Sequence, residues 1–146
     1  MNAPAFDYAA VIDDMPEARV GRGENYAAKG WASLVECSPS GVLAHVLGER
    51  GIAFVVEVSA PDASDARCTC EDFADTGLRC KHVVAAVKTV LDADPETLSD
   101  VAGRLPRLLD MLEMEERDDA GLLVERARRD PALLRELEGE AAVDSS

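Results

Sequence analysis

The sequence predicts an α+β fold in which a small antiparallel sheet is followed by helices. Three short runs of β-branched and apolar residues lie one hairpin turn apart in the first half of the chain. The 15-residue window from Cys68 to His82 then holds three of the four cysteines and one of the two histidines. Beyond this window, leucines recur at helical spacing, which indicates a helical C-terminal segment.

A helix is predicted over residues 16–29, after an N-terminal arm. Pro16 suits the start of a helix because its missing N–H would have no partner there, and Gly30 is a typical stop. Gly21 and Gly23 oppose this helix because glycine lowers helix propensity.

Three strands are predicted at Trp31–Cys37, Val42–Leu47 and Ile52–Val58, separated by the turn sequences Ser-Pro-Ser-Gly and Gly-Glu-Arg-Gly. Connections of this length join neighbouring strands as an antiparallel meander. A three-stranded sheet with one apolar face needs a cover. The apolar stripe from Val83 to Leu91 predicts the helix that provides it.

The spacing of Cys68, Cys70, Cys80 and His82 predicts a metal site. Thiolate and imidazole are the ligands that zinc prefers, and Cys3His is a closed structural shell. Alternate residues of an extended chain point to one face, so Cys68 and Cys70 form one half of the site. Residues two apart in a helix do not face each other, so the helix must begin at or just after Cys80. We therefore expect one structural Zn²⁺ between a strand end and a helix start.

These four residues resemble the SWIM-type zinc fingers, whose signature is Cys-x-Cys, a variable loop, and Cys-x-His leading into an apolar helix. Residues 22–26 with Gly30, and residues 127–133, look like the segments that flank the finger in bacterial members. The resemblance implies a DNA-binding or protein-interaction module of the kind found in transposase-like proteins, chromatin-remodelling ATPases and recombination factors.

Other interpretations of the cysteines and histidines remain open. Cys68 and Cys70 could form a redox pair, or the site could be filled only transiently. Cys37 and His45 lie eight positions apart with no third partner in the sequence. We expect Cys37 to be a core residue and His45 to lie on a solvated face of the sheet.

The charge of the chain is strongly negative and unevenly spread. The net charge of −14 divides into −6 for residues 1–66, +1 for 67–91 and −9 for 92–146. Such a field repels nucleic acid at long range.

A local basic patch around the finger is the alternative that would favour phosphate contact. The cations that would form it flank or lie within the finger: Arg19, Arg22, Lys29, Arg67, Arg79, Lys81 and Lys88. The competing interpretation is that Arg79 and Lys81 offset the −1 charge of three thiolates, an imidazole and Zn²⁺.

The last third is predicted to be helical. Asp94-Pro95 and Asp130-Pro131 each place a capping residue before a proline. Leucines 105, 108, 109 and 112 make one stripe. We interpret this stripe as the inner face of a helical hairpin, with a docking surface for a partner helix as the alternative.

The predicted organisation is an N-terminal arm and helix (1–30), the sheet and zinc finger (31–92), a helical segment (93–139) and an acidic tail (140–146). The fold class is α+β, with a three-stranded antiparallel sheet and a zinc knuckle leading into a helix. Neither a secretory signal nor an apolar run long enough for a membrane span is present, which favours the cytoplasm.

The functional hypothesis is an intracellular zinc-stabilised adaptor that binds protein. DNA binding through the basic patch is the alternative, and a zinc/thiol redox switch is a minor one. We expect no enzymatic activity because four protein ligands close the zinc shell, whereas catalytic zinc keeps an open position. ATPase, nuclease and kinase motifs are absent from the sequence, so the chain is expected to act as a stand-alone module or a subunit.

Overall fold

The structure is a computed structural model that describes residues 4–13, 15–48, 50–70 and 80–144, of which 140–144 are described by backbone alone. Its elements are α1 (Tyr8–Val11), α2 (Glu17–Ala28), β1 (Ala32–Ser38), β2 (Gly41–Leu47), β3 (Ala53–Ser59), β4 (Arg67–Cys68), α4 (Lys81–Asp92), α5 (Pro95–Met114), α6 (Ala120–Arg128) and α7 (Pro131–Asp144). Among these residues, no helix is both long and apolar enough to cross a membrane.

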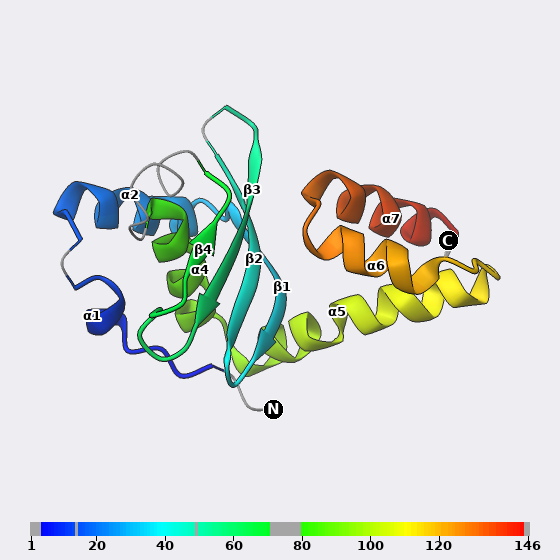
Figure 1. The fold of residues 1–146 in the computed structure, drawn as a ribbon, viewed down its shortest axis with the longest axis horizontal. Coiled ribbons are helices and arrows are strands. Elements are labelled where there is room, and N and C mark those ends of the chain that lie inside the picture. Colours follow the sequence, from blue (N-terminus) through cyan, green and yellow to red (C-terminus); the bar gives the residue numbers. More distant parts are fainter. Residues whose placement is uncertain (1–3, 14, 49, 71–79, 145–146) are drawn as a thin grey trace.

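The sheet is antiparallel, with strands in the order β1-β2-β3-β4 (Figure 1). Strands β1 to β3 lie where the sequence predicts them, but the prediction of three strands is wrong. The fourth strand pairs Val56 with Cys68 and Glu57 with Arg67. It spans two residues, too few for a hydrophobic period, and forms because the edge of β3 is available to pair with it.

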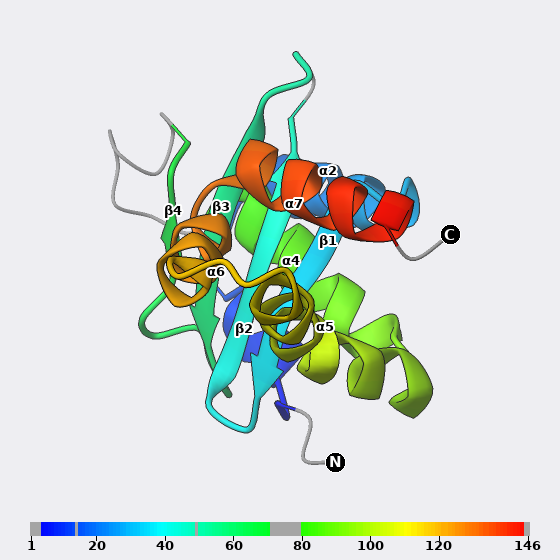
Figure 2. The same ribbon diagram turned by 90° about the vertical axis from the view of Figure 1, so that its right-hand side faces the viewer.

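Both faces of the sheet are covered, so it forms the middle layer of the molecule (Figures 1 and 2). On one face, Val46 and Val56 pack in a cluster with Val83 and Val87 of α4, which confirms the predicted covering helix. On the other face, three strand residues pack against the C-terminal helices, in a cluster of Val35, Leu43, Val55, Leu105, Leu108, Leu112, Ala120, Val124, Ala127, Leu134 and Leu137. The leucine stripe of α5 is therefore used inside the chain and is not available to a partner helix.

Helix α2 packs closely along α4, and Gly23 makes this possible. A Cβ built on Gly23 would lie 2.5 Å from Cβ of Val84 and 2.6 Å from the backbone oxygen of Lys81. Gly23 lowers the helix propensity of α2, but the contact between α2 and α4 needs it because a side chain would not fit there. Gly30, with φ of +72°, follows the end of the helix as predicted.

The C-terminal unit consists of three helices, α5 to α7. Asp94 caps α5 by accepting a hydrogen bond from the Thr97 backbone N–H at 2.7 Å, and Asp130 accepts one from that of Leu133 at 3.2 Å. Both predicted aspartate-proline starts are therefore confirmed. Helix α7 continues to Asp144, within the range that the sequence assigns to an acidic tail.

Polar contacts attach these helices to the sheet. Arg104 forms an ion pair with Glu138 at 2.7 Å and donates to the Leu34 carbonyl at 2.7 Å. Arg128 pairs with Glu36 at 2.7 Å, and Arg129 pairs with Glu57 at 2.6 Å.

His45 lies at this junction and is only 7% exposed. Its Nε2 donates to the Arg128 carbonyl at 2.8 Å. The expectation of a solvated His45 is wrong because the C-terminal helices cover that face of β2. Cys37 is buried as expected, with its sulfur 3.7 Å from the Leu98 carbonyl oxygen.

Candidate metal centre

Two elements bring the predicted ligands together. Cys68 ends β4, Cys70 follows two residues later, Cys80 is the N-cap of α4, and His82 lies in its first turn. The predicted start of this helix is confirmed. The loop between Cys70 and Cys80, residues 71–79, lies outside the described residues.

Thr69 explains how the two cysteines of the Cys-x-Cys pair point to one side. Its backbone N–H donates to the Val55 carbonyl at 3.2 Å, and its hydroxyl accepts from the Val55 N–H at 3.0 Å. Thr69 is thereby fixed to the edge of β3. Its neighbours on either side extend away from that contact, because side chains alternate along an extended chain.

The ligand atoms lie at distances suited to a small tetrahedral ion. Nδ1 of His82 is 3.6 Å from the Cys68 sulfur and 3.7 Å from the Cys80 sulfur, and all four ligand atoms lie within 4.8 Å of one another. Tetrahedral zinc, with bonds of about 2.3 Å to sulfur and about 2.0 Å to nitrogen, sets its ligands about 3.5 to 3.8 Å apart. Within the described part of the chain, this is the one group of such side chains that could hold a metal ion.

All four side chains are buried. The His82 ring lies 4.7 Å from that of Phe54 and 5.8 Å from that of Tyr26, measured between ring centroids. Among the described residues, Nε2 of His82 has no hydrogen-bond partner, so the ring directs its polar contacts at the sulfurs through Nδ1. A histidine buried for packing alone would need partners for its nitrogens, so this arrangement fits a ligand.

Contact between the sulfurs shifts their ionisation in opposite directions. A hydrogen bond from Cys68 lowers the pKa of Cys80 to about 4, with help from His82 and the Val83 backbone N–H. The same contact, together with burial, raises the pKa of Cys68. Neighbouring thiolates repel each other, which favours a protonated sulfur. A bound divalent cation would instead favour the thiolate form of each ligand. The donor set therefore fits zinc, which would be held by Cys68, Cys70, Cys80 and His82.

The predicted basic patch is brought together only in part. Arg19, Arg22 and Lys81 line one pocket of about 290 Å³, with Pro16 and Ala18. Arg79 lies outside the described residues.

Three other cations of the predicted patch make contacts elsewhere. Lys29 lies 4.6 Å from the centroid of the Trp31 ring. Lys88 lies 5.5 Å from the Tyr8 ring centroid and 3.5 Å from a carboxylate oxygen of Asp92. Arg67 lies 3.6 Å from a carboxylate oxygen of Asp65.

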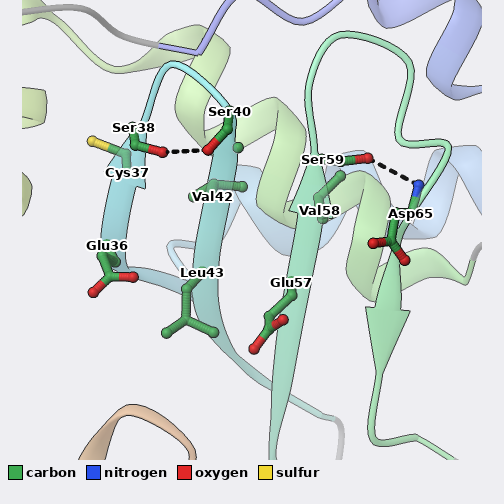
Figure 3. Close-up of a pocket in the computed structure, with 11 residues that line it drawn as sticks. Glu36, Cys37, Ser38, Ser40, Val42, Leu43, Glu57, Val58, Ser59 and Asp65 are labelled. Atoms are coloured by element: carbon green, nitrogen blue, oxygen red, sulfur yellow. Dashed lines mark hydrogen bonds between the residues drawn. The ribbon is translucent and has the colours of Figure 1, made fainter. Parts of the chain in front are cut away.

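A second pocket, of about 210 Å³, lies across β1, β2 and β3 and was not predicted (Figure 3). Ser38 and Ser40 share a hydrogen bond of 2.8 Å at its rim, and the carboxylates of Glu36 and Glu57 lie along it. Both carboxylates are paired with arginines of the C-terminal unit. The residues of the pocket come from β1, β2, β3 and two of the connections beside them, so only the strand register could have revealed it.

Comparison with known proteins identifies the region around the cluster. Residues 54–91 match the family model of the SWIM zinc finger, a span that runs from β3 to α4 and includes all four predicted ligands. The prediction of a SWIM-type finger is confirmed. Neither the curated proteins nor the solved structures contain a match to the chain.

Proposed function

We propose that this chain, with a SWIM zinc finger at residues 54–91, is an intracellular adaptor that binds a protein partner and is stabilised by one structural Zn²⁺. The burial of all four candidate ligands supports the structural role of the ion in this proposal. An ion held by these four ligands would join the end of β4 to the start of α4, and its tetrahedral shell would be complete. Catalytic zinc keeps an open coordination position, so we propose no enzymatic role.

Zinc is the metal that the donor set favours. Three thiolates and one imidazole are soft ligands, which suit zinc far better than magnesium or calcium. The cysteines are all free thiols, as ligands of a metal must be, and a reducing compartment such as the cytoplasm would keep them so.

The distribution of charge supports protein over nucleic acid as the partner. The residues from 92 onward carry −9 of the total −14, and this segment forms the outer layer on one face of the sheet. Nucleic acid would meet a repulsive field there. The described cations around the finger also do not form a continuous track, since Lys29, Lys88 and Arg67 contact other groups.

The deciding experiment is recovery of the tagged chain from its native cell, with and without nuclease. We expect stoichiometric zinc by elemental analysis and a co-purifying protein whose recovery is unchanged by nuclease. The Cys80→Ser variant is the control, since it should lose both zinc and a partner that contacts the finger. A partner lost on nuclease treatment would contradict the proposal.

DNA binding is the second candidate because Arg19, Arg22 and Lys81 share a pocket. It predicts a gel shift of duplex or single-stranded DNA at moderate salt, with affinity falling steeply as salt rises. A redox switch is a weaker candidate, since buried sulfurs are poorly accessible to oxidants. Release of zinc by mild peroxide, reversed by a thiol reductant, would support the switch.

A further inference from the structure

A cationic pocket lies where the start of α2 meets the first residue of α4. Arg19 and Arg22 line it from α2, and Lys81 lines it from α4. Three of the five described residues that line it are cations, although the chain has 29 acidic and 15 basic residues. Three cations around one concave site in such an acidic protein point to an anionic ligand.

The packing of α2 on α4 sets the positions of these cations. The Lys81 carbonyl would lie 2.6 Å from a Cβ on Gly23, so the two backbones are in direct contact next to the pocket. Arg22 precedes Gly23 directly, and Arg19 lies one helical turn before it. The two helices therefore pack directly against each other beside the pocket. A ligand therefore meets a partly preorganised site and orders only the ends of side chains.

We propose that this pocket binds one phosphate monoester, carried by a phosphorylated serine or threonine of the protein partner. The planar guanidinium group of an arginine can donate two parallel hydrogen bonds to two phosphate oxygens, and a lysine ammonium adds a compact positive charge. The inference rests on the proposed adaptor function, because it takes the ligand from a protein.

The arrangement favours a single phosphate over a run of phosphates. The Lys81 ammonium lies 5.4 Å from the centroid of the Tyr26 ring, so it stays beside the α2–α4 contact. Lys29, Lys88 and Arg67 are directed at other groups and do not extend the site. The net charge of −14 opposes a long polyanion, whereas contact with one dianion acts within the screening length of about 8 Å at physiological salt.

The test uses the zinc-loaded full chain and a capped phosphoserine, N-acetyl-O-phosphoserine N-methylamide, titrated by amide NMR. We expect shifts at the residues that line the pocket and none with the unphosphorylated compound. Arg22→Gln and Lys81→Gln should each weaken binding about tenfold, as expected for loss of one charged hydrogen-bond donor. Arg107→Gln, which removes the same charge from an exposed position on α5, should leave affinity unchanged.

Three results would overturn the phosphate site. These are equal binding of the unphosphorylated compound, equal binding of sulfate, or an equal loss in Arg107→Gln. An oligonucleotide that binds more tightly than phosphoserine, and that also loses affinity in Lys29→Gln and Lys88→Gln, would assign the cations to nucleic acid instead. Zinc content and far-UV circular dichroism of each variant check that it is folded.

The partner recovered from cells separates this inference from the adaptor function. If its binding survives phosphatase and the Arg22→Gln change, the phosphate site is wrong while the adaptor function stands. If the capped phosphoserine binds but no protein partner is recovered, the site stands and the adaptor function is wrong.

Discussion

His82 and His45 show how two buried histidines of one chain differ in role. Nδ1 of His82 lies 3.6 Å from a cysteine sulfur, whereas Nε2 of His45 donates to the Arg128 carbonyl at 2.8 Å. The first has cysteines at metal-ligand spacing in the sequence and the second does not. Local spacing therefore identified the candidate ligand, but it could not show that His45 is covered.

Removal of a candidate ligand should make the thermal stability of the protein independent of bound metal. Zinc binding in small fingers is worth about 10 to 16 kcal/mol, so much of the attachment of α4 depends on the ion if it is bound. We expect a chelator to lower the Tm of the unmodified protein and to leave the lower Tm of His82→Ala unchanged. Cys37→Ser, a buried cysteine outside the cluster, should keep its zinc and its response to chelator. If chelator left the Tm of the unmodified protein unchanged, a structural ion would be ruled out.

Stability should fall as the pH drops below about 6.5, the ordinary pKa of histidine. Burial lowers the pKa of His45, and nearby Arg104 lowers it further, against the raising effects of the Arg128 carbonyl, Glu138 and Asp130. The unfolded chain then takes up the proton first, so stability is full above this pH and is lost as the pH falls towards the folded pKa. Chemical denaturation in saturating zinc measures this slope.

The matched variant for this pH effect is His45→Gln, which keeps a donor for the Arg128 carbonyl but does not titrate. We expect a smaller loss of stability between pH 6.5 and the folded pKa in this variant. An identical pH slope in both proteins would show that other groups are responsible.

At the scale of the elements, the contact between α2 and α4 is decided by one glycine. Gly23 is buried within α2, and any side chain there would meet Val84 and the Lys81 backbone. Gly21, two residues earlier in the same helix, has open space where its Cβ would be. The two glycines that looked alike in the sequence therefore differ in role.

Gly23→Ala and Gly21→Ala should change stability in opposite directions. Overpacking at Gly23 should cost about 1 to 3 kcal/mol, because the clash at 2.5 Å with Val84 outweighs the gain in helix propensity. Gly21→Ala should stabilise by about 0.5 to 1 kcal/mol, because only the propensity term acts. Urea denaturation of both variants measures the difference. Equal stabilisation by both changes would show that α2 does not pack against α4 in this way.

At the scale of the whole molecule, the sheet separates the candidate metal centre from the C-terminal helices. The cysteine cluster packs with α4 and with Leu98 of α5 on one face, whereas Leu105, Leu108 and Leu112 of α5 pack with α6 and α7 on the other. The ion pairs of Arg128 and Arg129, and the hydrogen bond from Arg104 to the Leu34 carbonyl, join the C-terminal helices to the sheet. The two faces therefore contribute to stability through different contacts.

Loss of a leucine from the second face should destabilise the protein without releasing zinc. Leu112 is fully buried, so Leu112→Ala should cost about 2 to 5 kcal/mol. Leu122 is 70% exposed, and Leu122→Ala should stay within about 0.5 kcal/mol. Denaturation with parallel zinc analysis measures both. Release of zinc by Leu112→Ala in the folded state would show that the two faces are coupled.

Much of the fold was predictable because its signals are local. Strands β1 to β3, the start of α4 at Cys80, and the aspartate-proline starts of α5 and α7 all follow from spacing and turn chemistry over a few residues. Strand β4 was missed because two residues are too few to show the alternation of apolar and polar residues that predicts a strand. It forms through its pairing with β3.

The amino-acid sequence alone determined the α+β class, the SWIM finger and the four candidate ligands, because their order and spacing are properties of one short segment. Only the tertiary structure decided that both faces of the sheet are covered, that Gly23 sets the contact of α2 with α4, and that Arg19, Arg22 and Lys81 line one pocket. These features join residues far apart in the chain, and such contacts depend on how elements pack, which no local pattern records.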